Sequence, residues 1–120
     1  DVARAAIEGQ FLNIKRASAW MQRAPESIFL TGGASANDAI AQVCADVFQT
    51  PVQRLNVSAS VALGAAIRAW LAAQKAPASA ADALLAPFRE ARTFTPETAA
   101  ASIYEERMAT LTHLLAQATA

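Results

Sequence analysis

Two adjacent glycines, Gly32 and Gly33, give this sequence its clearest capacity for ligand chemistry. They follow a short apolar run, residues 27–31, and precede a segment with helical periodicity that ends near residue 48. Because glycine lacks a Cβ, both residues can adopt a positive φ and let a ligand approach the backbone closely. The predicted helix would point free N–H groups and its positive dipole end at this turn, which suits a phosphate or another electron-rich group.

Asn37 is the polar side chain with which the turn could recognise a base. Its amide both donates and accepts hydrogen bonds, so it could pair with the edge of adenine. The spacing alone leaves two interpretations open: a nucleotide-binding turn, or an ordinary strand-to-helix turn whose glycines serve tight packing. The sequence excludes a Walker A loop and a GxGxxG motif, because neither pattern occurs here.

The other residues that could take part in catalysis or ligand binding are interpreted as structural. Cys44 falls in an apolar stripe, which predicts an inert buried thiol, and His113 lies off the apolar face of the last predicted helix. Gly64 interrupts a predicted helix, and close helix packing explains it better than a place in a nucleotide cleft. No HExxH, CxxC or GxSxG motif occurs, so we expect no metal site and no serine-hydrolase site in this chain.

The composition narrows the class of protein. A hydrophobic content of 54% with 17% charged residues excludes a disordered segment, and a net charge of zero gives no indication of nucleic acid or anionic lipid. The longest apolar stretch, residues 61–73, is broken by Arg68 and is too short to span a bilayer. One cysteine fits a reducing, cytoplasmic location, and a start at Asp1, inside a helical pattern, suggests a piece of a longer protein.

The elements that must position the turn occur in the order β-α-β-α. A first helix ending at Ala24-Pro25 precedes them. The strand at residues 27–31 should be buried, and residues 35–38 resemble a capping box that begins the next helix. A second strand covers residues 52–57, and Ser58 or Ser60 would cap a third helix. This order predicts a helix-dominated α/β fold with parallel strands joined by crossover helices.

The rest of the chain, residues 75–120, is predicted to contain a linker, a short helix and a final long helix. Residues 75–82, rich in Ala, Pro and Ser, indicate a linker, and a short helix is expected over residues 83–88. Thr95-Pro96-Glu97 is a typical helix start, and the final helix presents a regular apolar face. The residues of that face are Tyr104, Met108, Leu111, Leu115 and Ala118.

Four blocks of sequence, in the same order and with similar gaps, resemble the FGGY family of carbohydrate kinases. They lie within residues 1–10, 31–37, 42–52 and 59–66, and the second block resembles the adenosine-binding turn of that family. Within the family, Glu-Gly-Gln at residues 8–10 and the Gly-Gly-Ala-Ser-x-Asn pattern are most similar to the members that act on D-xylulose.

This resemblance implies part of an actin-like ATPase (ribonuclease H-like) domain. Gly32, Gly33, Ala34 and Asn37 would contact adenosine or its α-phosphate, although Ala34 stands where many members have a third glycine. The catalytic aspartate, the sugar site and most Mg²⁺ ligands would lie outside this chain, so the chain alone should be inactive. The partners that the resemblance implies are ATP with Mg²⁺ and a ketose. From charge and hydropathy we expect no nucleic acid or membrane partner, and we also expect a homo-oligomer.

The resemblance also implies a division of the chain. Residues 1–75 would form the nucleotide-binding part of the C-terminal domain, 76–95 a linker and short helix, and 96–120 the last helix of the same domain. Two other functions remain open: another actin-like ATPase, or a non-catalytic helical interaction module. As part of a domain, the chain should expose apolar surface or a strand edge and self-associate.

Overall fold

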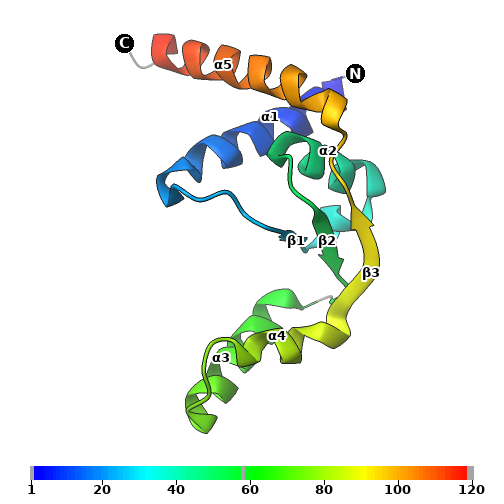
Figure 1. Cartoon of the computed structure of the whole chain (residues 1–120), viewed down its shortest axis with the longest axis vertical. Coiled ribbons are helices and arrows are strands. Elements are labelled where there is room, and N and C mark those ends of the chain that lie inside the picture. The colour runs from blue at the N-terminus through cyan, green and yellow to red at the C-terminus, as the bar shows by residue number, and fades with distance from the viewer. Residues whose placement is uncertain (1, 58, 119–120) are drawn as a thin grey trace.

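A computed structural model of the chain describes residues 2–57 and 59–118 (Figure 1). Five α-helices and three strands alternate with short 3₁₀ helices in these residues, over an extent of 50 × 32 × 23 Å. The α-helices and strands are α1 (Val2–Ala17), β1 (Ile28–Leu30), α2 (Asp38–Phe48), β2 (Val52–Leu55), α3 (Ser60–Gln74), α4 (Ala80–Leu85), β3 (Arg89–Phe94) and α5 (Ala101–Ala118). The 3₁₀ helices are η1 (Ala19–Met21), η2 (Gly33–Ala36), η3 (Ala86–Phe88) and η4 (Thr98–Ala100).

The three strands form one mixed sheet in the order β1-β2-β3. β1 and β2 are parallel, with Ile28 opposite Val52, which confirms the predicted β-α-β unit. β3 runs antiparallel to β2, with Val52 opposite Phe94, and it lies in residues predicted to hold only a linker and a short helix. The expected parallel pairing of the two predicted strands is therefore correct, and β3 is an additional antiparallel strand that the sequence analysis did not predict.

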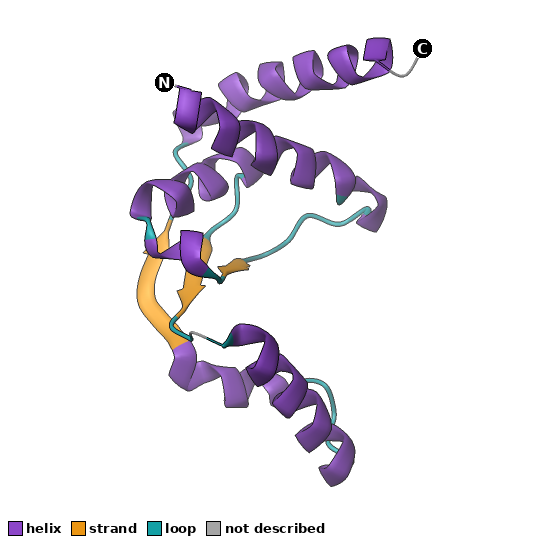
Figure 2. Ribbon diagram, turned by 180° about the vertical axis from the view of Figure 1, so that it is seen from behind, coloured by secondary structure: helices purple, strands orange, loops and turns teal. Residues whose placement is uncertain are grey.

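The hydrophobic core lies on both sides of α2. Towards the sheet, α2 packs with Val52 and Phe94, and away from the sheet its Val47 packs with Leu12 of α1 and Tyr104 of α5. Figure 2 shows the resulting layers, in which α1 and α5 lie beyond α2 and the strands lie on its other side. These contacts confirm the predicted apolar face of α2 and the first part of the predicted face of α5, through Tyr104, Met108 and Leu111, whereas Ala118 is exposed.

β1 is less buried than its sequence predicts. Ile28 and Leu30 are half-buried against the α2 side of the sheet, whereas Phe29 is 38% exposed on the other face. β1 is also an edge strand, since among the described strands it pairs with β2 alone. The apolar run predicts the strand correctly, but on its second face Phe29 is covered only in part, by the Arg89 guanidinium 4.7 Å from the centre of its ring.

α1 ends seven residues before the predicted end at Ala24. Ser18 Oγ donates a hydrogen bond to the carbonyl of Lys15, and Gln22 adopts a left-handed conformation with φ of 52° after η1. Serine side chains compete for helix carbonyls in this way, which favours helix ends. Ala24 and Pro25 therefore lie beyond the end of α1, in a segment that is no longer helical.

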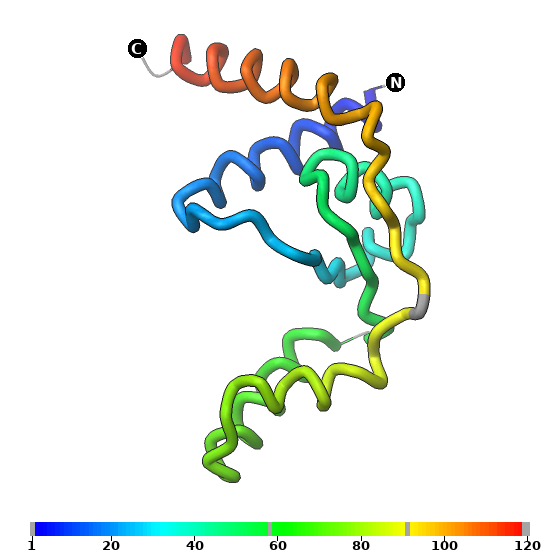
Figure 3. Tube along the Cα trace, in the orientation of Figure 1, coloured from blue at the N-terminus to red at the C-terminus, as the bar shows by residue number. Residues whose placement is uncertain are grey.

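The helices α3 and α4 form a hairpin that projects from the sheet end of the molecule (Figure 3). α3 has the predicted bounds, but Ala59 occupies its N-cap position without a side-chain hydrogen bond. Ser60 is already helical, so the prediction that it caps α3 is wrong, and Ser58 lies outside the described residues. α4 begins at Ala80, inside the predicted linker.

α5 begins at Ala101, after η4, and not at the predicted Thr95-Pro96-Glu97 start. α2 holds this segment in an extended conformation. Gln42 Nε2 donates to the Thr95 carbonyl at 2.9 Å, and Asp46 Oδ1 accepts the Glu97 N–H at 2.8 Å. These two hydrogen bonds hold residues 95–97 against α2, and the helical conformation begins only after them, first in η4 and then in α5.

Candidate functional site

The Gly-Gly turn forms an elbow between β1 and α2, defined here as residues 31–37. Gly32 has φ of 97°, a left-handed value that glycine tolerates, and it redirects the chain out of β1. Gly33 lies in the 3₁₀ helix η2 instead. The sequence prediction of positive φ is therefore correct for Gly32 and wrong for Gly33.

The backbone of the elbow is open to solvent. Residues 31–34 are exposed, and a Cβ added at Gly32 or Gly33 would meet no atom within 4 Å. The space beside both glycines is therefore not filled by the described side chains. An incoming ligand can reach the backbone there without displacing protein atoms.

Asn37 performs a structural task in the elbow. Its Oδ1 accepts hydrogen bonds from the N–H groups of Ala39 at 2.9 Å and Ile40 at 3.4 Å, so Asn37 is the N-cap of α2. The predicted capping box is wrong, because Ser35 lies in η2 and its Oγ donates to the Gly32 carbonyl at 2.6 Å. With the oxygen committed to α2, Asn37 can offer a ligand only the donors of its Nδ2.

Asp38 places a carboxylate in the first turn of α2, where the helix dipole favours negative charge. Arg54 Nη1 binds Asp38 Oδ1 at 2.7 Å, and Arg92 binds Asp38 Oδ2. Desolvation acts to raise the pKa of Asp38, but the two arginines outweigh it and hold that pKa below its ordinary value. The carboxylate at the start of α2 is thus engaged by two guanidinium groups, one from β2 and one from β3.

Arg54 is the residue of the site that sequence reasoning missed. Its Nη1 also lies 3.3 Å from the Ser35 carbonyl and 3.1 Å from the Ala36 carbonyl, so it joins β2 to the elbow. Its side chain is only 13% exposed. A signal existed in the sequence: Arg54 follows the buried Val52 by two residues in a strand, so it lies on the core-facing side of β2.

The remaining candidates behave mostly as predicted. Cys44 is buried, and burial raises the pKa of its thiol to about 11. His113 is exposed and lies 3.0 Å from Gln117 Nε2 on the same helix. Gly64 is exposed on α3, and a Cβ there would meet no atom within 4 Å, so the prediction of close helix packing at Gly64 is wrong.

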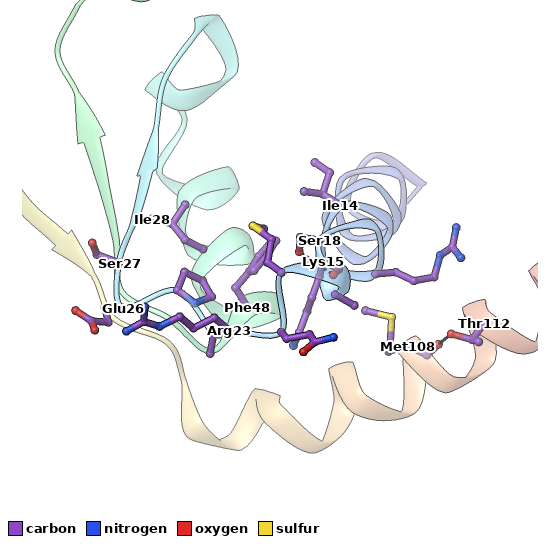
Figure 4. Close-up of a pocket in the computed structure, with 16 residues that line it drawn as sticks. Ile14, Lys15, Ser18, Arg23, Glu26, Ser27, Ile28, Phe48, Met108 and Thr112 are labelled. Carbon is purple, nitrogen blue, oxygen red and sulfur yellow. Dashed lines mark hydrogen bonds between the residues drawn. The ribbon is translucent and has the colours of Figure 1, made fainter. Parts of the chain in front are cut away.

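Two cavities lie away from the elbow. One, of about 1200 Å³, lies between the end of α1, the start of β1 and α5, where Ile14, Ile28 and Met108 line it (Figure 4). The other, of about 820 Å³, lies between α1 and α5. Neither is lined by an elbow residue, so the elbow is an open surface turn in the described part of the chain.

Residues 2–57 and 59–118 contain neither a metal-binding cluster nor a helix that could span a membrane. No group of three His, Cys, Asp or Glu side chains in these ranges could hold a metal ion. None of the helices within them has the length and apolarity needed to cross a bilayer.

Comparison with known proteins places this architecture in a family. Residues 1–73 match the FGGY family of carbohydrate kinases, C-terminal domain. Xylulose kinase from Mus musculus is 44% identical over 71 residues, which cover 56% of this chain and 13% of that protein. The chain therefore spans about an eighth of the length of this relative.

Two solved structures resemble the whole described fold. A ligand-bound xylulose kinase from Lactobacillus acidophilus superposes with a TM-score of 0.78 at 24% identity, covering 99% of this chain and 24% of that one. A gluconate kinase from the same organism superposes with a TM-score of 0.73 at 25% identity, covering 94% of this chain and 23% of that one.

Proposed function

Because the chain belongs to the FGGY family of carbohydrate kinases, we propose that it supplies the adenosine-binding part of a kinase that transfers phosphate from ATP to a sugar. The fold is helix-dominated and has part of the actin-like ATPase architecture of these kinases. Family membership favours a sugar kinase over the other actin-like ATPases and over a non-catalytic helical module. A cytoplasmic location belongs to the proposal, and the single cysteine supports it.

The proposed substrate is D-xylulose. Support comes from the xylulose kinases among the relatives, with 44% identity in the Mus musculus protein. The fold itself does not select a sugar, because a gluconate kinase superposes almost equally well. The family match over residues 1–73 supports the assignment of residues 1–75 to nucleotide binding and leaves 96–120 as the last helix of the same domain.

The observation that carries the proposal is the open elbow. Gly32, Gly33 and Ala34 present exposed backbone on which a flat base or a ribose can rest, and Nδ2 of Asn37 provides a donor at its edge. Exposed backbone and one amide donor suit the nucleoside end of ATP. ATP would supply the phosphoryl group that is transferred.

Other parts of the kinase complete the proposed site. Asp38 is committed to two arginines, and the described residues contain no metal-binding group of three, so Mg²⁺ would be held mainly elsewhere. The catalytic base and the sugar contacts would also lie outside this chain. Positioning and charge neutralisation provide most of the catalysis in phosphoryl transfer, and this chain would contribute positioning.

An assembly of several copies is also part of the proposal. Large apolar side chains are exposed, among them Trp20 at 79% and Val61 at 86%, and β1 is an edge strand. Such surfaces favour association with further protein. The exposed apolar surface that the sequence predicts is therefore present, while self-association stays a prediction that light scattering can test.

Asn37 provides the experiment on the proposed site, in the complete kinase that carries this segment. Asn37→Ala removes both the helix cap and the Nδ2 donor, whereas Asn37→Ser keeps a side-chain cap and replaces the Nδ2 donor with a shorter hydroxyl that reaches less far towards a ligand. If Nδ2 recognises adenine, both variants raise KM for ATP by about tenfold, the effect of about 1.4 kcal/mol. KM for the sugar stays unchanged in both.

The opposite result would limit Asn37 to a structural role. If Asn37→Ser leaves KM for ATP unchanged while Asn37→Ala raises it, Asn37 acts only as a cap. Gly33→Val then tests the elbow itself, because Gly33 lacks a positive φ and its surroundings have room for a larger side chain. A normal KM for ATP in Gly33→Val would reject adenosine binding at the elbow.

A further inference from the structure

Arg54 connects the elbow to the sheet through more contacts than any other described side chain of β2 makes. Its Nη1 shares two N–H groups among three acceptors, the Asp38 carboxylate at 2.7 Å and the carbonyls of Ala36 at 3.1 Å and Ser35 at 3.3 Å. Both carbonyls belong to η2, the turn that begins at Gly33. The carbonyls at the end of a short helix need a partner outside it, and Arg54 supplies that partner.

The guanidinium of Arg54 is itself held in place. Arg54 Nε binds Glu90 Oε2 of β3 at 2.9 Å, and the guanidinium carbon lies 5.1 Å from the centre of the Phe94 ring. Since the side chain is 13% exposed, solvent competes little for its donors. Arginine suits this arrangement because its planar group bonds several oxygens in fixed directions.

We infer that Arg54 is a positioning residue for the nucleotide, one that acts through the elbow without touching the ligand. It fixes the carbonyls of η2 and therefore the path of the exposed Gly32-Gly33 backbone on which the nucleoside rests. This inference depends on the proposed function, since it names how the same site keeps its shape. Binding is tighter when the site is already ordered, because less conformational entropy is lost on binding.

Arg92 provides the matched control. It binds the same carboxylate, Asp38, and its guanidinium lies 4.6 Å from the same Phe94 ring. Its hydrogen bond within the site goes to Asp38, whereas Arg54 also bonds the elbow carbonyls. Removing either arginine therefore takes one cation from Asp38, but only the loss of Arg54 releases the elbow.

The experiment compares Arg54→Gln, Arg54→Lys and Arg92→Gln in the complete kinase. We expect Arg54→Gln to raise KM for ATP about tenfold, as for the loss of a charged hydrogen bond, with KM for the sugar unchanged. Arg92→Gln should change KM for ATP by less than about twofold, as for an exposed ion pair. Arg54→Lys should lie between them, because one ammonium cannot reach Glu90 and both carbonyls together.

These measurements separate positioning from simple loss of stability. A partly unfolded enzyme loses kcat, since fewer molecules are active, but its KM for ATP stays the same. Equal effects of Arg54→Gln and Arg92→Gln would overturn the inference, because the charge on Asp38 would then be the cause. Normal KM for ATP in Arg54→Gln with a raised value in Gly33→Val would reject the inference alone, and normal values in both would reject the proposed function.

Discussion

The helices α2 and α3 have a similar composition but differ in how far their side chains are buried. Each follows one of the two parallel strands, and each is rich in alanine and large apolar residues. Six residues of α2 are buried, among them Val43, Val47 and Asp46, whereas none of the fifteen described residues of α3 is buried. The two helices are therefore similar in apolar content, but α2 has the stronger apolar stripe and is the one that other elements cover.

The strands and helices that pack against α2 come from distant parts of the chain. β2 and β3 cover one side of it through Val52 and Phe94, while α1 and α5 cover the other through Leu12 and Tyr104. α3 packs against α4, which also has no buried residue among those described. Periodicity thus predicts a helix and its apolar face, but a face is buried only where another element lies against it.

Thiol reactivity gives the largest contrast between the two helices. Cys44 of α2 is buried with a pKa raised to about 11, while Ala65 of α3 is exposed. Because only thiolate reacts, a cysteine at Ala65→Cys should react with Ellman's reagent near pH 8 at least about a hundredfold faster than Cys44. Equal rates would mean that α2 opens readily, and the contrast would be lost.

Two valines test the same contrast through stability. Val47 of α2 is completely buried, and Val61 of α3 is 86% exposed. Val47→Ala should lower the free energy of unfolding by about 2 kcal/mol, through lost burial and the cavity left behind. Val61→Ala should change it by less than about 0.5 kcal/mol, as is usual for a surface position. Urea unfolding followed by circular dichroism measures both, and similar losses would show that α3 is packed in solution.

Local signals explain how much of the fold could be predicted from the sequence. Gly32-Gly33 and Pro51 mark the ends of β1 and α2, and the apolar stripe of α2 identifies its buried face. The place of the elbow follows from the same signals. Each of these depends on residues within one or two turns of the chain, which is why sequence alone was sufficient.

The elements that sequence reasoning missed are held by distant partners. β3 has the sequence Arg-Glu-Ala-Arg-Thr-Phe, and its strand state depends on pairing with β2 and on the ion pairs Arg54–Glu90 and Asp38–Arg92. The late start of α5 depends on bonds from α2. The role of Arg54 at the elbow likewise joins residues 18 and 19 positions apart. Patterns of neighbouring residues carry no information about such contacts.

Glu8 ties together the two helices that cover α2, and α3 has no comparable attachment among its described residues. The Glu8 carboxylate of α1 accepts hydrogen bonds from Tyr104 of α5 at 2.9 Å and from Arg4 Nε at 2.9 Å, and it pairs with Arg107 of α5. Desolvation acts to raise the pKa of Glu8, but the bonds from Arg4 and Tyr104 and the charge of Arg107 outweigh it. The pKa of Glu8 therefore lies below its ordinary value of 4.5.

This lowered pKa predicts the smallest of the three effects, an acid-dependent loosening of the cover over α2. The ionised Glu8 stabilises the fold fully above pH 4.5, and its contribution is lost as the pH falls below that value through the folded-state pKa. Because the side chains of Arg4 and Arg107 are 64% and 49% exposed, solvent screens both ion pairs and the contribution of each to stability is small. Glu8→Gln should therefore be less stable than the unmodified chain in urea unfolding near neutral pH, and the difference should shrink in acid. A difference that stayed constant with pH would show that the shape of the side chain, and not its charge, holds α5 against α1.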